Sequence, residues 1–371
     1  MNMDTGCKKD ELDTPCLVLD LDKLDRNIEL VHGAVDAQGK QVRPHAKTHK
    51  CSRLARRQVE AGAVGVCVAK VSEAEALIEA GLTGILITGP QATRRKVEQV
   101  VALWHRSPDL LLVVDDMSAA RLLSGAVSTV GVSAGVLVDV DVGLERTGVR
   151  LEQVSDFALA VDALPGLSVR GIQAYAGHLQ HVLAFSERRS KSLSCLRGAA
   201  EAFMRVKTVV PTCDIFSGSG TGTVDIDIGI PELTELQPGS YVFMDAEYAV
   251  VESLAGGPMS DRLLPALTLL TSVVSANHDG HVTVDAGLKS LYRHGGTPRV
   301  LRPGGLVYDW FGDEYGRVTA EAGYGLPVPG AVLELMVSHC DPTVNLFDCY
   351  HVCRGDTVVG TWPIDLRGCC R

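Results

Sequence analysis

The chain has 371 residues, of which 46% are hydrophobic and 22% charged, and its formal net charge is −10 at pH 7. This composition is typical of a globular protein with a large core, and the length predicts two domains. The acidic balance disfavours a nucleic-acid partner, because phosphate binding needs clustered Lys and Arg. No apolar run reaches the roughly 18 residues that span a bilayer, and the N-terminal segment lacks the hydrophobic stretch of a signal peptide.

Eleven cysteines are scattered between Cys7 and Cys370, and several lie within apolar strand patterns. An odd, dispersed set indicates reduced thiols rather than a disulfide framework. We therefore expect a cytoplasmic protein, with an organelle as the alternative.

Eight short apolar segments alternate with amphipathic helical patterns along the first two thirds of the chain. They cover residues 41–44, 64–68, 84–88, 110–114, 135–140, 170–175, 212–216 and 240–244. Near-continuous apolar strands suit a parallel sheet that is covered on both faces. Eight of them with intervening helices predict an α/β fold, the (β/α)8 TIM barrel; a doubly wound sheet is the alternative, although it would not need eight strands.

After about residue 255 the strand-like runs follow one another without helices. A hairpin is predicted around Arg354–Asp356, so the C-terminal part is expected to form an antiparallel β domain. The N-terminal strand "PCLVLDL" could join either this domain or the barrel.

Reactive side chains follow the predicted barrel strands. Lys47 follows the first strand, Lys70 the second, Asp141 and Arg146 the fifth, Tyr175, His178 and His181 the sixth, and the segment "SGSGTGT" (217–223) the seventh. All therefore lie at carboxyl ends of strands, the face where barrel enzymes build their active sites.

The segment 217–223 is a glycine-rich turn with hydroxyl groups and no charge. Its amides and hydroxyls could hold a phosphate, although a flexible loop explains it equally well, and it lacks the lysine of a nucleotide-binding P-loop. A phosphate cup opposite a strand-end lysine is what pyridoxal phosphate (PLP) needs, with the lysine as Schiff base.

Lys47 and Lys50 compete for the role of that lysine. Lys47 lies three residues after Pro44 and so nearest the barrel mouth, whereas Lys50 is predicted to begin the next helix and to face solvent. His45 and His49, on either side of Lys47, are expected to pack against or support it.

The segment "VSHCDPTVNLFD" contains a second candidate site. If it is a strand, His339 and Asp341 share a face and could chelate a divalent metal with open positions for catalysis. On the residues alone, a hydrogen-bonded His–Asp pair at a strand end explains the spacing better. A rival set on one face, Cys349, His351 and Cys353, lacks an apparent fourth zinc ligand.

Six segments in this order resemble the D-threonine aldolase family: "TPCLVLDLDKLDRNI", "RPHAKTHK", "GLERTGV", "GHLQH", "SGSGTGT" and "SHCDPTVNLFD". The resemblance runs from about Thr14 to Asp348. The family belongs to the alanine racemase-like, fold type III class of PLP enzymes, which also holds the eukaryotic-type D-serine dehydratases.

The resemblance implies a homodimer with a PLP-binding barrel over residues 22–255 and a β domain over residues 256–371, completed by residues 1–21. It implies Lys47 as the Schiff-base lysine, His339 and Asp341 as metal ligands, and His181 as the base acting on the substrate hydroxyl. It also places Arg146 and Tyr175 beside the cofactor ring. For the phosphate we select Ser219, Gly220 and Thr221, with Gly222 and Thr223 as alternatives. The roles of His178 and Glu314 stay unassigned.

The reaction implied is cleavage of a β-hydroxy-D-amino acid, such as D-threonine, to glycine and an aldehyde. The alternative within the class is a D-serine or 3-hydroxy-D-aspartate dehydratase, which carries His–x–Cys and binds zinc. Asp341 is a harder oxygen donor that suits Mn²⁺, with Mg²⁺ or Co²⁺ as alternatives. Two readings from other classes are a non-catalytic PLP-binding protein, which would lack the β domain, and a metal-dependent barrel hydrolase without PLP.

Overall fold

The structure is a computed structural model that describes residues 5–371. The chain divides into two compact units. The barrel unit comprises Leu30–Lys47, Ser52–Gly239 and Gly368–Arg371, and the β unit comprises Met1–Glu29, Thr48–Cys51 and Ser240–Arg367. The domain boundaries predicted from the sequence, which place the barrel at residues 22–255, remain a proposal. Residues 1–4 of the predicted β domain lie outside the described residues.

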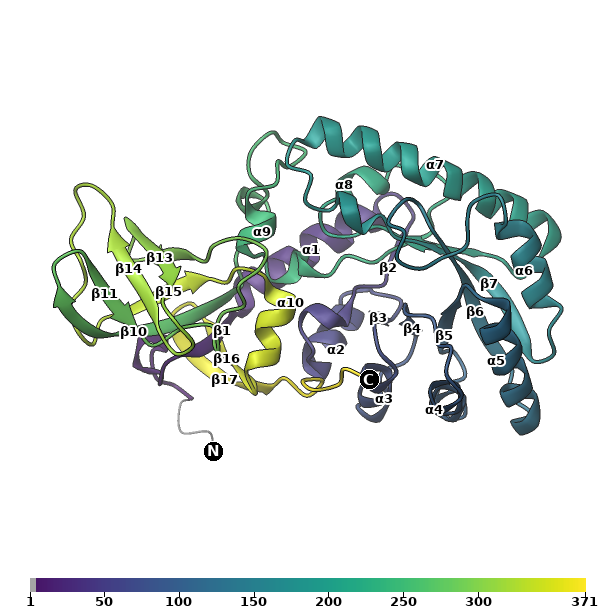
Figure 1. Ribbon diagram of the computed structural model, residues 1–371, viewed down its shortest axis with the longest axis horizontal. Helices are drawn as coiled ribbons and strands as arrows, with labels where there is room; N and C mark the ends of the chain where they lie inside the picture. Colours follow the sequence, from purple (N-terminus) through teal and green to yellow (C-terminus); the bar gives the residue numbers. More distant parts are fainter. Residues whose placement is uncertain (1–4) are drawn as a thin grey trace. The chain divides into compact units, whose positions relative to one another are not determined.

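The barrel unit is built on an eight-stranded parallel sheet (Figure 1). In sheet order its strands are β2 (Gln41–Val42), β9 (Glu235–Leu236), β8 (Ile215–Gly218), β7 (Leu167–Ala174), β6 (Ala134–Val140), β5 (Leu111–Val114), β4 (Ile85–Ile87) and β3 (Val66–Val68). The two edges meet, because the Val64 amide donates to the Val42 carbonyl oxygen at 3.0 Å and the Cys67 amide to that of Pro44 at 2.8 Å. The predicted barrel is confirmed.

Helices alternate with these strands and cover the outside of the sheet (Figure 1). They are the part of α1 (Leu21–Asp36) from Leu30 onward, α2 (Ser52–Glu60), α3 (Val71–Glu79), α4 (Arg94–Trp104), α5 (Met117–Val130), α6 (Val154–Asp162), α7 (Phe185–Val209) and α8 (Val224–Asp227). Strands β3, β4 and β5 are buried at every position, which explains their near-continuous apolar sequences. Among residues 5–371, no helix combines the length and the hydropathy needed to cross a membrane.

The eighth barrel strand is not the predicted segment 240–244. The strand is the two-residue β9, while Ser240–Val242 forms a 3-10 helix in the β unit. The apolar pattern of this segment predicts burial correctly, since Tyr241, Val242 and Phe243 are fully buried. It does not predict the secondary structure.

A buried ion pair links strand β2 to strand β9. Arg43 Nε and Nη2 donate to the two carboxylate oxygens of Glu235 at 2.9 and 2.8 Å, and Arg43 Nη1 also donates to the Gly84 carbonyl oxygen. Burial alone would lower the pKa of Arg43, but the charge and hydrogen bonds of Glu235 raise it. The pair therefore stays ionised and ties three segments of the barrel together.

Replacing Glu235 by alanine will destabilise the barrel by about 3–5 kcal/mol, because it leaves the Arg43 guanidinium buried without its partner. Urea unfolding measures this loss. Asp214→Ala is the control, since Asp214 pairs with Arg170 at the surface and should cost less than about 1 kcal/mol. Equal losses for the two variants would contradict the role of the buried pair.

The β unit holds a nine-stranded sheet that is antiparallel except where β1 meets β16. In sheet order its strands are β11 (His281–Val284), β14 (Gly316–Ala320), β13 (Leu306–Trp310), β12 (Arg299–Arg302), β15 (Val332–Met336), β10 (Leu267–His278), β1 (Cys16–Asp20), β16 (Cys349–Arg354) and β17 (Thr357–Pro363). Strand β10 also pairs with β11, which closes part of the sheet into a barrel. Two short helices, α9 (Ala246–Ala249) and α10 (Cys340–Thr343), belong to the same unit.

Strand β1 settles the question left open by the N-terminal sequence. It pairs with β10 and β16 and so completes the β unit. The predicted hairpin is the β16–β17 pair. All eleven cysteines lie in the described part of the chain, and none of them forms a disulfide there.

Candidate active site

Lys47 lies just beyond the carboxyl end of β2, in the 3-10 helix η2 (Ala46–Thr48). The chain leading to it is fixed to the segment after β9, because the His45 amide donates to the Pro238 carbonyl oxygen at 3.0 Å. Lys47 is half-buried, and its own amide donates to Nδ1 of His45 at 3.4 Å. The lysine is thus held at the end of the barrel that the sequence predicted.

Lys50 does not face solvent, and that prediction was wrong. It is 6% exposed, has a left-handed φ of 47°, and its carbonyl oxygen accepts the Leu366 amide at 2.9 Å. The cause is that Thr48–Cys51 packs within the β unit and α2 begins only at Ser52. His49 packs there too, fully buried, with its carbonyl oxygen bonded to the Tyr350 hydroxyl at 2.6 Å.

His45 links Lys47 to polar groups inside the barrel. Because Nδ1 of His45 accepts the Lys47 amide, the proton of a neutral ring is assigned to Nε2, which lies 3.3 Å from Thr88 Oγ1. The Thr88 hydroxyl donates onward to the Val68 carbonyl oxygen at 3.1 Å. His45 therefore supports the backbone that carries Lys47.

Sequence reasoning missed three buried polar side chains beside this network. Gln173 Nε2 donates to Asp139 Oδ1 at 2.9 Å, and Gln237 Nε2 donates to Gln173 Oε1 at 3.2 Å. Burial raises the pKa of Asp139, while hydrogen bonds from Gln173 and Thr147 oppose that rise. The available signal was a polar residue inside each of the apolar strands β6 and β7.

Arg146 and Tyr175, both expected to lie beside the cofactor ring, are close to each other. Arg146 lies in the loop after β6 and Tyr175 directly after β7. The Arg146 guanidinium carbon is 5.8 Å from the centre of the Tyr175 ring, within cation–π range. The next residue, Thr147, anchors the loop by donating to Asp139 Oδ2 at 2.7 Å.

The glycine-rich segment 217–223 begins inside β8, which ends at Gly218, and the turn after the strand carries three buried hydroxyls. Ser219, Thr221 and Thr223 are each at most 2% exposed, and Ser219 has a left-handed φ of 71°. Behind the turn, burial raises the pKa of Asp227, while hydrogen bonds from Ser192, Thr223 and Ser219 oppose that rise. Ser219 and Thr223 therefore tie the turn to Asp227 by hydrogen bonds.

Gln180 and Arg188 form hydrogen bonds with the backbone of this turn at Gly222. The Gly222 amide donates to Gln180 Oε1 at 2.9 Å, and Arg188 Nε donates to the Gly222 carbonyl oxygen at 2.7 Å. His181, the predicted base, is the residue after Gln180 and is half-buried. The structure therefore joins the His181 segment to the glycine turn, whereas His178 is exposed.

If the turn holds the phosphate of PLP, as the family resemblance leads us to expect, replacing Gly222 by alanine will weaken PLP binding by at least about tenfold, the factor that corresponds to roughly 1.4 kcal/mol. A Cβ there would lie 2.0 Å from the Gln180 carbonyl oxygen, so the turn must shift. Titration of cofactor-free protein with PLP, followed by absorbance, measures the loss. Gly125→Ala in α5 is the control, since its Cβ would meet nothing within 4 Å; equal affinity in both variants would contradict a phosphate role for the turn.

In the β unit, His339 does not lie in a strand with Asp341. Strand β15 ends at Met336, His339 is the N-cap of α10, and Asp341 lies in the first turn of that helix. Pro342 is tolerated there because the first turn needs no amide donor. The strand argument for pairing His339 with Asp341 was therefore wrong, and their role as metal ligands stays a proposal.

His339 lies among carboxylates. Its Nδ1 is 2.9 Å from Asp245 Oδ2 and 3.2 Å from Glu247 Oε2. Burial alone would lower the pKa of His339, but the hydrogen bond and charge of Asp245, with the charges of Asp341 and Glu247, raise it to about 9. Neither Asp245 nor Glu247 was singled out from the sequence, because they lie more than 90 residues away along the chain.

Both sets of residues fit the groups that the family resemblance implies. A strand-end lysine and a buried turn of amides and hydroxyls match an aldehyde and a phosphate. In the β unit, the imidazole of His339 and the carboxylate of Asp341 are donors that suit a divalent ion of intermediate or hard character.

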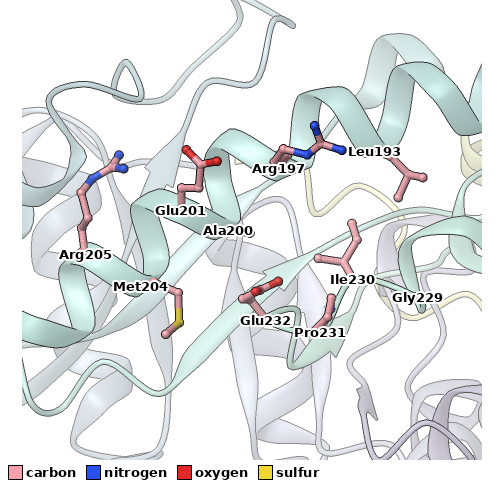
Figure 2. A pocket seen from close by; sticks show the side chains of 10 residues that line it. All are labelled: Leu193, Arg197, Ala200, Glu201, Met204, Arg205, Gly229, Ile230, Pro231 and Glu232. Atoms are coloured by element: carbon pink, nitrogen blue, oxygen red, sulfur yellow. The ribbon is translucent and has the colours of Figure 1, made fainter.

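A surface hollow of about 630 Å³ lies elsewhere on the barrel unit (Figure 2). Side chains of α7 form one side, and the segment after α8 forms the other. Its lining residues are Leu193, Arg197, Ala200, Glu201, Met204, Arg205, Gly229, Ile230, Pro231 and Glu232. None of them is a predicted site residue.

Comparison with known proteins decides the family. Residues 19–247 match the family model for the alanine racemase N-terminal domain, and residues 266–353 match that for a putative serine dehydratase domain. The D-threonine aldolase of Arthrobacter sp. is 38% identical, over 96% of this chain and 93% of that protein. The chain belongs to the D-threonine aldolase family.

A solved structure and a further sequence relative support this assignment. A D-threonine aldolase structure from Filomicrobium marinum superposes with a TM-score of 0.93, at 36% identity, over 99% of this chain and 98% of that one. The 3-hydroxy-D-aspartate aldolase of Paracoccus denitrificans (strain Pd 1222) is 35% identical over 98% of this chain and 94% of its own length. The predicted alanine racemase-like barrel with a C-terminal β domain is confirmed.

One relative has a different activity. The D-threo-3-hydroxyaspartate dehydratase of Delftia sp. (strain HT23) is 29% identical over 95% of this chain and 97% of that protein. A cysteine-to-alanine variant of the dehydratase was solved in a metal-free form. Aldolases and dehydratases are both lyases, so the expectation that this chain is a lyase is confirmed.

Proposed function

We propose that this protein cleaves β-hydroxy-D-amino acids, such as D-threonine, to glycine and an aldehyde, using PLP and a divalent metal ion. The observation that carries the proposal is Lys47 at the end of β2, in a barrel that also holds the glycine turn after β8. The identity to D-threonine and 3-hydroxy-D-aspartate aldolases supports the reaction type.

In the barrel unit, each candidate residue has a separate role in binding PLP. Lys47 binds the aldehyde of PLP, and Arg146 and Tyr175 line the ring. Ser219, Gly220 and Thr221 hold the phosphate through hydroxyl and amide groups. When bound, PLP supplies an electron sink for negative charge at Cα of the substrate.

The remaining tasks concern the β-hydroxyl of the substrate. His339 and Asp341 hold the metal ion, which when bound supplies Lewis acidity that lowers the pKa of a hydroxyl. His181 takes the proton from that hydroxyl as general base. The imidazole and carboxylate donors favour Mn²⁺, with Mg²⁺ or Co²⁺ as alternatives.

The proposal includes a homodimer that acts on small amino acids in the cytoplasm, without a nucleic-acid partner. The absence of disulfides among the described residues supports a reducing compartment. The net charge of −10 supports the absence of a phosphate-backbone ligand.

A comparison of substrates tests the reaction type. Protein loaded with PLP and Mn²⁺ is expected to release aldehyde from D-threonine and from 3-hydroxy-D-aspartate, and not from L-threonine. Coupling to an aldehyde-reducing enzyme measures the rate. Ammonia release without aldehyde would contradict the proposal.

A second candidate function is dehydration of a β-hydroxy-D-amino acid, and the dehydratase relative supports it. The aspartate at position 341 favours cleavage, because the dehydratases of this class carry a cysteine there. Formation of a 2-oxo acid from D-serine would favour the dehydratase.

A further inference from the structure

The ring of His339 is oriented by a hydrogen bond at its Nδ1 atom. Its Nδ1 lies 2.9 Å from Asp245 Oδ2, a carboxylate oxygen that can only accept from the ring. Nδ1 therefore carries the proton, and Nε2 is the ring atom left to bind an ion.

Asp245 is a rigid support for that ring. It is fully buried, and it caps α9 by accepting the Tyr248 amide on Oδ1 at 3.0 Å. Its Oδ2 also accepts the Cys340 amide at 3.0 Å. The flanking backbones pair as well, because the Ala246 amide donates to the Val337 carbonyl oxygen at 2.9 Å.

Asp245, His339 and Cys340 could also bind a metal ion together, since their ligand atoms lie within 4.8 Å of one another. Three donors already occupy the carboxylate of Asp245, however: the His339 ring and the amides of Tyr248 and Cys340. A carboxylate bonded in this way suits the support of a metal-binding histidine, where outer partners commonly contribute 10–100-fold in metal affinity.

We propose that Asp245 is a positioning residue, which fixes the ring of His339 so that Nε2 binds the metal ion. The inference rests on the proposed function, specifically on His339 as a metal ligand. Asp245 acts through His339 and does not itself contact the ion.

Mn²⁺ affinity of the metal-free protein, measured by electron paramagnetic resonance, tests this role without recourse to activity. Asp245→Asn is expected to bind Mn²⁺ about 10–100-fold more weakly than the parent. Asp116→Asn is the matched control: Asp116 caps α5 through the Ala119 amide at 2.9 Å, as Asp245 caps α9, and its loss should leave Mn²⁺ affinity unchanged. Glu247→Gln tests the second carboxylate and should cost less than Asp245→Asn.

Unchanged affinity in Asp245→Asn, with affinity lost in His339→Ala, would overturn the inference while keeping the proposed metal site. Unchanged affinity in His339→Ala would instead overturn the metal site of the proposed function. A strong thiolate charge-transfer band in the Co²⁺-loaded protein, lost in Cys340→Ser, would show that the three side chains bind the ion together and would also overturn the inference.

If Asp245→Asn does not fold, a measurement on the unmodified protein still tests the role of Asp245. Nitrogen NMR of histidine-labelled protein loaded with an NMR-active cadmium isotope is expected to show metal coupling at Nε2 of His339 and a proton on Nδ1. His339→Gln identifies the signal. Coupling at Nδ1 would overturn the inference.

Discussion

Replacing Lys47 by alanine will abolish the visible absorbance of bound PLP and reduce cleavage of D-threonine by at least about 10³-fold, as expected for loss of a covalent catalytic group. Alanine keeps the backbone hydrogen bond from residue 47 to His45 Nδ1, so the barrel around β2 should persist. The loss therefore reports the amine itself. Absorbance of the purified, PLP-reconstituted variant measures it directly.

Two other lysines are controls for Lys47. Lys70 follows β3 in the same barrel and is exposed, so Lys70→Ala should keep both the absorbance and the activity. If the absorbance persists in Lys47→Ala and disappears in Lys50→Ala, the assignment of the PLP lysine is wrong.

Removing the metal ion will stop cleavage and leave the PLP absorbance in place. We expect chelation by EDTA to lower the rate by at least about 10²-fold and added Mn²⁺ to restore it, because the ion supplies several kcal/mol of charge stabilisation. His339→Ala and Asp341→Ala should each reproduce the loss without full recovery in Mn²⁺. Stopped assays for glycine measure the rate, with metal content determined alongside.

His278→Ala is the control for the histidine substitution, since His278 is an exposed residue of the same β unit. Its rate and metal content should match those of the parent. Full activity after thorough removal of metal would contradict a catalytic role for the ion.

The barrel and the order of its candidate residues could be predicted because each candidate residue directly follows its strand in the sequence. Arg146 and Tyr175 each follow an apolar segment that forms a parallel strand, and parallel strands bring their carboxyl ends to one face. Strand β9 could not be predicted in this way, because two residues between polar neighbours give no periodic signal.

The surroundings of His339 could not be predicted, since they depend on tertiary contacts. The Asp245–His339 hydrogen bond joins residues 94 positions apart. Likewise, Gln180 meets Gly222 only through the packing of the β7–α7 segment against the glycine turn. The alternation argument failed at Asp341 because a helix, not a strand, begins at Cys340.

The most direct test of carbon–carbon cleavage is the fate of D-threonine in deuterium oxide, followed by NMR with the PLP- and Mn²⁺-loaded protein. Cleavage predicts glycine and acetaldehyde in equal amounts, with solvent deuterium at Cα of the glycine. Conversion of D-threonine to 2-oxobutanoate and ammonia would contradict it.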